Sequence, residues 1–276
     1  MYDATNNDAN KCLRGTVSSV NTWRVRAAIL LTAVVFVLIF YVYGQPIAFV
    51  LFTKHEIRNS PELWTVPTAL SAAAAESPTG KTLSYYGYDF DSPWSEGKEE
   101  QNLKSLIRVN FPGGASIAFF DPTASVNEVQ LLTEQSAKNN RDARRVWGAE
   151  AMRSRYAFRS TMLNLTPADL QLFTTRQKMV ADSILLTLKG AYVSSRRHGL
   201  YSFQTAWFRG FQYGAPAQDD GVTIEAFDAQ DHEIKIIVEW GHRISPRPSQ
   251  ADINRILFSL RPTPAPAAPP AADQPA

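Results

Sequence analysis

Residues 200–240 read LYSFQTAWFRGFQYGAPAQDDGVTIEAFDAQDHEIKIIVEW. Apolar and polar side chains alternate over three segments of this stretch, as they do in β-strands that bury one face. The alternation predicts one long strand over residues 201–213 and two more over residues 222–227 and 233–240, with a turn at residues 228–231. Consecutive strands joined by short turns predict an antiparallel meander, which sets the fold class.

A helix is predicted directly after the meander, over residues 249–260. Ser249 stands at its start and Asp252 follows three residues later, which is the spacing of a capping box. The apolar positions then recur at i, i+3, i+4 and i+7, at Ile253, Ile256, Leu257 and Leu260. This spacing gives the helix one apolar face, which we expect to pack on the sheet.

The chain before the meander completes the pattern. Residues 82–90, 105–111 and 115–120 have strand character, and Pro112-Gly113-Gly114 between the last two is a hairpin signal. Residues 126–192 have a helical pattern, in which Thr166-Pro167 marks the start of a new helix. The order of these elements predicts one α+β domain over residues 81–261, built on an antiparallel sheet with packed helices.

This arrangement resembles the Mog1/PsbP-type sandwich, in which a final helix lies across a central antiparallel sheet. Residues 249–260, which end in FSL, would be that helix. The segments YDFDSPW at residues 88–94 and YSFQ at residues 201–204 are similar to parts of uncharacterised single-span bacterial envelope proteins. The resemblance implies a fold and a location in the envelope, and it supplies no catalytic residue.

A second informative stretch covers residues 27–52. From Ala27 to Tyr43 there is no charge, proline or glycine, and after Gly44-Gln45-Pro46 the apolar run continues to Phe52. As a helix, roughly 26 residues extend about 39 Å, which exceeds the ~30 Å of bilayer hydrocarbon. The stretch therefore predicts a transmembrane anchor in contact with the lipid bilayer, with a kink or the outer helix end near Pro46. A cleaved signal peptide and a buried core helix are the alternatives.

The charges on either side of this stretch predict its orientation. Basic residues are more numerous before it than after it, so the positive-inside bias places the N-terminus in the cytoplasm. The predicted order is a cytoplasmic tail at residues 1–26, the anchor at 27–52, a stem at 53–80, the α+β domain at 81–261 and a disordered Pro/Ala tail at 262–276. The main domain would then be periplasmic or extracellular.

Composition narrows the class of protein. The single cysteine, Cys12, lies in the predicted cytoplasmic tail, so the outer domain has no disulfide, which favours a bacterial inner-membrane protein. The first 54 residues hold five basic and two acidic residues of the totals of 28 and 26, which leaves 23 basic and 24 acidic residues in the remainder. A nearly neutral domain argues against nucleic-acid binding.

Two surfaces are candidate binding sites. Tyr201, Phe203, Trp207 and Phe211 share one face of the predicted long strand, where they would form an aromatic platform for sugars or lipids or pack as core beneath a helix. Arg141, Arg144, Arg155 and Arg159 share a stripe if residues 138–159 form one helix. That stripe would contact an anionic surface, either lipid headgroups or an acidic envelope protein, or it would be an ordinary solvated face.

Signals for catalysis are weak. Asp89 and Asp91 have the spacing of the metal-binding pair of many glycosyltransferases, but a strand end also accounts for them. The four histidines show no zinc-ligand spacing, and we predict no catalytic, cofactor-binding or metal-binding residue. The first hypothesis is a non-enzymatic, membrane-tethered module that binds or positions an envelope partner. The alternatives are an envelope glycan-processing enzyme that uses surface carboxylates and an accessory subunit of a membrane complex.

The predicted topology can be tested with a reporter enzyme that is active only outside the cytoplasm. Fused after Leu260, the reporter should be active, and fused at the N-terminus it should be silent, because the positive-inside bias keeps that end in the cytoplasm. Reporter activity in cells measures this. The reverse pattern would contradict the predicted orientation.

Overall fold

The structure is a computed structural model. It describes residues 31–35, 44–55, 60–71, 80–103, 105–124, 141, 144–172, 174–193, 198–241 and 247–264. The chain divides into two units, Met1–Phe52 and Thr53–Ala276. Residues 31–35 and 44–55 are helical. Residues 1–30, 36–43 and 265–276 lie outside the described residues, and with them 12 of the 26 residues of the predicted anchor, the whole predicted cytoplasmic tail and all of the predicted Pro/Ala tail except residues 262–264. A helix with the length and apolarity to span a bilayer is not found in the part of the chain that the structure describes.

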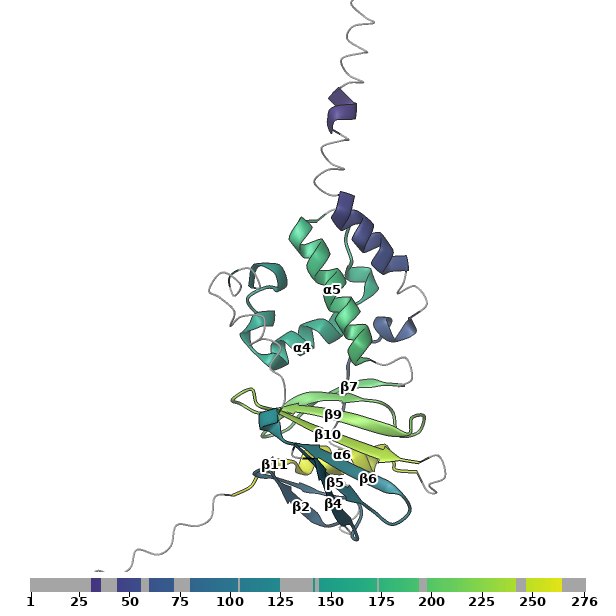
Figure 1. The fold of residues 1–276 in the computed structure, drawn as a ribbon, viewed down its shortest axis with the longest axis vertical. Coiled ribbons are helices and arrows are strands. Elements are labelled where there is room, and N and C mark those ends of the chain that lie inside the picture. The colour runs from purple at the N-terminus through teal and green to yellow at the C-terminus, as the bar shows by residue number, and fades with distance from the viewer. Residues whose placement is uncertain are drawn as a thin grey trace, which may run out of the picture. The chain divides into compact units, whose positions relative to one another are not determined.

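The second unit is built on an eight-stranded sheet with the strand order β1-β7-β8-β9-β10-β6-β5-β4 (Figure 1). Its strands are β1 (Thr68–Ala69), β4 (Lys98–Leu103), β5 (Leu106–Asn110), β6 (Ala115–Phe120), β7 (Leu200–Gln204), β8 (Arg209–Tyr213), β9 (Gly221–Phe227) and β10 (Glu233–Trp240). All neighbouring strands are antiparallel except β1 and β7, which are parallel. The predicted α+β class with an antiparallel sheet is therefore confirmed.

The predicted long strand over residues 201–213 is wrong, because β7 and β8 are two strands of a hairpin. The turn between them contains neither glycine nor proline. Instead, the Thr205 hydroxyl oxygen accepts hydrogen bonds from the backbone N–H groups of Trp207 and Phe208. The Thr205 side chain thus closes the turn. The alternating pattern continues through it, so the sequence showed no break between the two strands.

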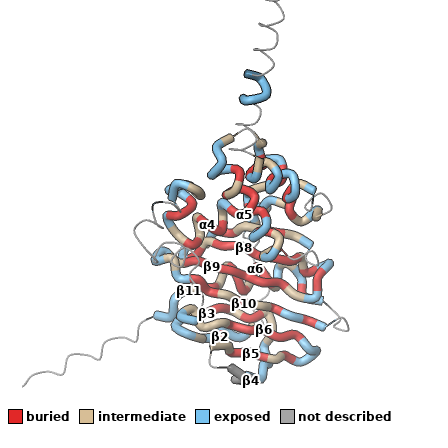
Figure 2. Tube along the Cα trace, turned by 45° about the horizontal axis from the view of Figure 1, so that its top comes forward, coloured by how far each residue is buried: buried red, intermediate tan, exposed pale blue. Residues whose placement is uncertain are grey.

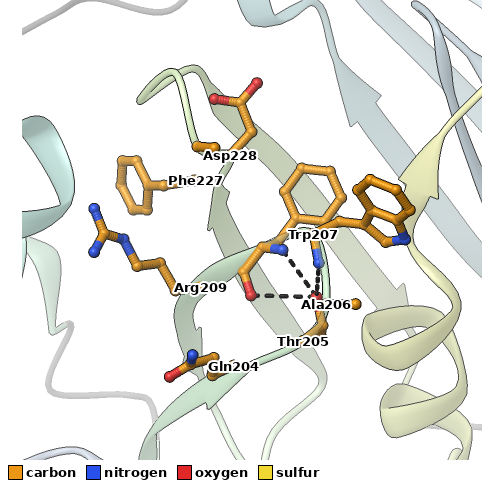
Figure 3. Close-up of a pocket in the computed structure, with 9 residues that line it drawn as sticks. Gln204, Thr205, Ala206, Trp207, Arg209, Phe227 and Asp228 are labelled. Atoms are coloured by element: carbon orange, nitrogen blue, oxygen red, sulfur yellow. Dashed lines mark hydrogen bonds between the residues drawn. The ribbon is translucent and has the colours of Figure 1, made fainter.

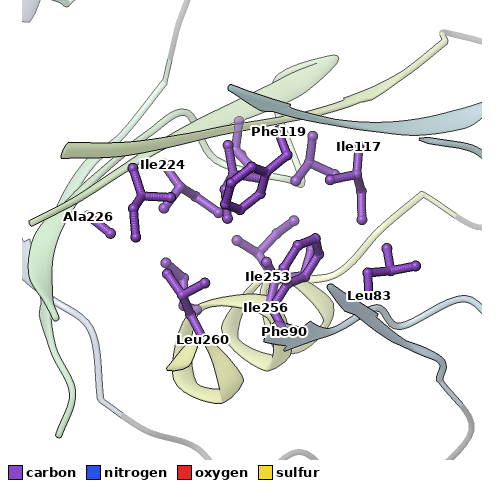
Figure 4. Packing of buried hydrophobic residues seen from close by; sticks show 14 of the residues in the cluster. Leu83, Phe90, Ile117, Phe119, Ile224, Ala226, Ile253, Ile256 and Leu260 are labelled. Carbon is purple, nitrogen blue, oxygen red and sulfur yellow. The ribbon is translucent and has the colours of Figure 1, made fainter. Parts of the chain in front are cut away.

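One face of the sheet packs against helix α6 (Gln250–Ser259) and a small second sheet. That sheet has the order β11-β3-β2, with β2 (Thr82–Tyr85), β3 (Tyr88–Asp91) and β11 (Arg261–Pro262). The predicted capping box of Ser249 and Asp252 is present at the start of α6. Ile253 and Ile256 of this helix, and Leu260 directly after it, lie against buried residues of both sheets, as Figure 4 shows. The predicted apolar face is confirmed.

The other face of the large sheet packs against α4 (Arg155–Asn164) and α5 (Arg176–Tyr192). Figure 2 shows the buried residues concentrated along the central strands between these layers. The predicted start at Thr166-Pro167 has its capping box, but it opens the short 3-10 helix η4 (Pro167–Asp169). Three further 3-10 helices are η1 (Pro61–Trp64), η2 (Pro122–Ala124) and η3 (Ala151–Arg153).

Residues 60–71, which the sequence assigns to a stem, lie on this folded unit. Leu63 is buried, and β1 pairs with β7 at the edge of the large sheet. The Lys189 ammonium donates hydrogen bonds to the backbone carbonyls of Leu63 at 3.1 Å, Thr65 at 2.7 Å and Leu165 at 2.7 Å. One buried cation on α5 therefore fixes the stem to the helices.

The environment of Lys189 changes its protonation. The side chain has no exposed surface, and burial lowers its pKa from 10.5 to about 8, with a smaller opposing effect from the charge of Asp169. The ammonium form is still the one that fits three carbonyl acceptors, because each of its three N–H groups then has a partner. Near neutral pH the lysine is charged and its hydrogen bonds are satisfied.

We predict a rise in stability with pH that depends on Lys189. Between about pH 8 and 10.5 the unfolded lysine keeps its proton while the folded lysine releases it, so the unfolded state binds more protons. The free energy of unfolding should therefore rise, on the order of 2 kcal/mol, between about pH 7.5 and 9.5. Urea unfolding of the full chain in detergent measures this, with Lys189→Met as the comparison. If both proteins show the same change with pH, Lys189 does not titrate in this window.

Candidate functional site

The β2–β3, β7–β8 and β9–β10 hairpin turns lie next to one another and line two neighbouring pockets. The first, of about 320 Å³, lies between the β7–β8 and β9–β10 turns and is drawn in Figure 3. It is lined by Gln204, Thr205, Ala206, Trp207, Phe208, Arg209, Phe227, Asp228 and Ala229. The second, of about 430 Å³, is lined by Tyr86, Tyr88, Asp121, Pro122, Thr123 and His232. We call them the Trp207 pocket and the Tyr86 pocket, and together they form the turn surface.

Trp207 is the most prominent side chain of the turn surface. It stands at the tip of the β7–β8 turn and is 58% exposed, whereas its neighbour Phe208 is 2% exposed. The Thr205 hydroxyl oxygen lies 3.2 Å from the Trp207 nitrogen and 2.9 Å from the Phe208 nitrogen, so the turn is closed from within. The structure thus holds a large apolar ring in solvent on a fixed backbone.

Arg209 is held on the opposite side of the same hairpin. Its guanidinium carbon lies 4.2 Å from the centre of the Tyr156 ring, and this ring is stacked on Phe211 at 5.5 Å. A cation over an aromatic face is attracted to it, which fixes the direction of the guanidinium. In Figure 3 the Trp207 indole and the Arg209 guanidinium extend away from each other. A ligand that contacts both must be larger than the pocket between them.

The β9–β10 turn separates the two pockets and is fixed by its own side chains. One Asp228 carboxylate oxygen accepts hydrogen bonds from the N–H groups of Gln230 and His232, and the other lies 2.9 Å from Nδ1 of His232. Asp231, at a φ of 69°, accepts hydrogen bonds from the first two backbone N–H groups of α4, at Arg155 and Tyr156. The β9–β10 turn therefore caps the N-terminus of α4.

Two tyrosines supply hydrogen-bond donors to the Tyr86 pocket. The Tyr86 ring stacks on Phe119 at 6.0 Å, and the Tyr88 ring meets Phe208 edge-on at 5.9 Å. Burial raises the pKa of both hydroxyls, with added contributions from the charges of Asp121 at Tyr86 and Asp228 at Tyr88. Both phenols are therefore protonated over the physiological pH range, so both can donate to a carbonyl oxygen.

The predicted aromatic platform is wrong as one surface. Phe203 stands opposite Gly210 and packs in the core beneath α6, whereas Phe211 stands opposite Ser202 and packs in the core beneath α4. Because β7 and β8 form a hairpin, the four side chains do not follow one strand. Tyr201 is half-buried, and Trp207 alone among the four belongs to the turn surface.

The predicted arginine stripe is also wrong. Gly148 has a φ of 89°, and it separates helical residues 144–147 from α4, so one continuous helix is not formed. Arg141 and Arg144 are exposed, but Arg155 and Arg159 are 6% and 3% exposed. These two buried arginines pair with carboxylates of the sheet, Arg155 with Glu233 and Arg159 with Glu225. They cannot contact an outside anionic surface while they occupy these positions.

Glu225 is the centre of a buried polar network in the core beneath α4. It accepts a hydrogen bond from the Tyr213 hydroxyl at 2.8 Å and pairs with Arg159, whose guanidinium carbon lies 3.9 Å from the centre of the Tyr192 ring. Burial raises the pKa of Tyr213 well above its ordinary value, and the negative charge of Glu225 adds to this effect. Glu225 was not among the residues predicted from the sequence, although an acid on the buried side of an apolar strand is a signal for a buried partner.

The two acids considered for catalysis have structural partners. Asp89 accepts a hydrogen bond from the Thr263 hydroxyl at 2.7 Å, and hydrogen bonds from Thr263 and Ser84 lower its pKa. Asp91 accepts a hydrogen bond from the Thr82 hydroxyl at 2.8 Å. Both acids thus connect strands of the small sheet. Within the described ranges, no three His, Cys, Asp or Glu residues are grouped in a way that could hold a metal ion.

Comparisons of the chain with protein-family models, with curated proteins and with solved structures found no match. The turn surface combines an exposed indole, an oriented guanidinium and two tyrosine hydroxyls on turns that their own hydrogen bonds hold in place.

We predict that Arg159 and Arg144 differ sharply in their effect on stability. Arg159→Ala leaves the buried Glu225 carboxylate without its cation and should reduce the free energy of unfolding by about 3–5 kcal/mol. Arg144→Ala changes an exposed position and should stay within about 0.5 kcal/mol. Chemical unfolding of the two variants measures this. Equal losses would contradict the assignment of Arg159 to the interior.

Proposed function

We propose that this chain is a membrane-tethered binding module of the bacterial envelope, whose turn surface binds a partner protein. The observation that carries the proposal is Trp207, an aromatic side chain held in solvent at 58% exposure, with Arg209 on the opposite side of the same pocket. Residues 27–52 would be the anchor, with the N-terminus in the cytoplasm and the folded unit in the periplasm or outside the cell. The apolar run and the charge bias at its flanks support this placement.

The architecture fits a Mog1/PsbP-type sandwich, which we include in the proposal. The support is the position of α6, which follows the meander directly and packs across one face of the antiparallel sheet (Figure 4). A scaffold of this kind presents its connecting turns at the ends of rigid strands, where binding residues commonly lie. The turn surface occupies such a position.

A protein partner suits the turn surface better than a small ligand. Trp, Tyr and Arg are the residue types that most often dominate the energy of protein interfaces, and here Trp207, Arg209 and the two tyrosines lie on neighbouring turns. The indole and the guanidinium extend in opposite directions, so a broad partner surface is needed to meet both (Figure 3). Their turns are already ordered, which reduces the entropy lost on binding.

The glycan-processing alternative receives less support from the geometry. Asp89 and Asp91 are engaged with Thr263 and Thr82, so their oxygens already accept hydrogen bonds within the small sheet. Anchoring within a membrane complex, the remaining alternative, is compatible with partner binding at the turn surface, because the two contacts use different parts of the chain.

The proposal predicts site-specific contact with a partner in native membranes. A photoreactive amino acid at position 207 should give a discrete cross-linked adduct, because the side chain there would lie within the interface. The same amino acid at Gln177, an exposed position on α5 and outside the turn surface, serves as the control and should give none. Arg209→Glu should reduce the adduct at position 207 at least about tenfold, by reversing a charge at the interface. The same adduct pattern at both positions, or no adduct at position 207, would contradict the proposal.

A further inference from the structure

We propose that the Tyr86 pocket binds a proline-rich segment, and that its occupant is this chain's own Pro/Ala segment, residues 264–270. The segment reads PAPAAPP and contains a P-x-x-P spacing at Pro266 and Pro269. Binding of the segment would regulate the turn surface. That regulatory part rests on the proposed function, whereas the binding of the segment does not.

The pocket has the chemistry that such a segment requires. A polyproline II chain makes no internal hydrogen bonds, so its carbonyl oxygens need outside donors and its proline rings need aromatic surfaces. The Tyr86 pocket offers the rings and hydroxyls of Tyr86 and Tyr88, and its remaining wall includes Pro122 and His232. Because Tyr86 stacks on the buried Phe119 and Tyr88 contacts Phe208, both rings are already in place.

The fold delivers the segment to this pocket. Strand β11 runs antiparallel to β3, with Pro262 opposite Tyr88, and the Thr263 nitrogen donates to the Gly87 carbonyl at 2.8 Å. The next residue, Pro264, therefore leaves the strand beside the turn that carries Tyr86. At about 3.1 Å per residue, the five residues from Pro264 to Pro269 extend about 15 Å, which is enough to cross a pocket that begins at this turn.

Covalent attachment favours this occupant over a segment of another molecule. A short connection holds a ligand near its site at an effective concentration on the order of millimolar, so even weak binding fills the site. Proline also fixes φ near −65°, which reduces the entropy lost when the segment is ordered. The spacing of Pro266 and Pro269 places both rings on one side of a three-residue turn, where they can meet the two tyrosines.

The consequence is competition at the turn surface. Tyr88 contacts Phe208, which also lines the Trp207 pocket, so a segment bound over Tyr88 lies at the border of the proposed partner site. A partner that covers both pockets must displace it. The affinity of the full chain for its partner would then be lower than that of a chain ending at Pro264.

A fluorescent peptide with the sequence of residues 262–272 tests the binding of the segment without any partner. In polarisation measurements it should bind the chain ending at Pro264 and bind the full chain at least about tenfold more weakly, because the chain's own segment fills the pocket. A full chain with Pro266→Ala and Pro269→Ala should bind the peptide as the shortened chain does. Tyr86→Asn removes the ring but keeps a residue that tolerates the φ of 50°, and in the shortened chain it should abolish binding.

The outcomes separate this inference from the proposed function. No peptide binding to the shortened chain would overturn the site, and equal binding to both chains would show that the pocket takes a segment of another molecule instead. Trp207→Ala in the shortened chain is the matched control and should leave peptide binding unchanged, since Trp207 does not line the Tyr86 pocket. Absence of the adduct at position 207 would contradict the proposed partner binding, and it would not bear on the binding of the Pro/Ala segment. A stronger adduct in the shortened chain than in the full chain is the result expected from competition.

Discussion

Two ion pairs in the interior determine how α4 sits on the sheet. Arg155 meets Glu233 and Arg159 meets Glu225, and all four side chains are nearly without exposed surface. Removing these charges from water is costly, so each must find its partner in the folded state. The arginines are four residues apart, one turn of helix, and the glutamates lie on neighbouring strands. A shift of α4 by one residue would separate both pairs, so the pairs select a single register for the helix.

The same register organises the turn surface at the ends of the strands. When α4 is in place, its first N–H groups point at the Asp231 carboxylate, and this contact holds the β9–β10 turn at one end. Asp228 closes the turn at its other end through the backbone of Gln230 and His232. Tyr156, the second residue of α4, also supports Arg209 from below. The buried ion pairs of α4 thus help to order the solvent-exposed residues of the turn surface.

The sequence predicted those elements whose signals are local. The capping box and apolar spacing of α6, and the alternation of β9 and β10, depend on residues a few positions apart, and the structure contains all of them. The β7–β8 turn escaped prediction because a threonine hydroxyl, rather than glycine or proline, closes it. The burial of Arg155 and Arg159 was not predicted either. Helical spacing shows which residues share a face of a helix, but it does not show whether another part of the protein covers that face. The site itself, at three turns, depends on strand register, which no single stretch encodes.

The attachment of residues 60–71 through Lys189 has a mechanical consequence. Tension that reaches the folded unit from the N-terminal side is first carried by η1 and by the carbonyls of Leu63 and Thr65, which share one ammonium. That cation sits on α5, so the load passes into a long helix before it reaches the edge strand β1. Pulling on the chain from that side and loss of a proton from Lys189 would therefore act on the same attachment.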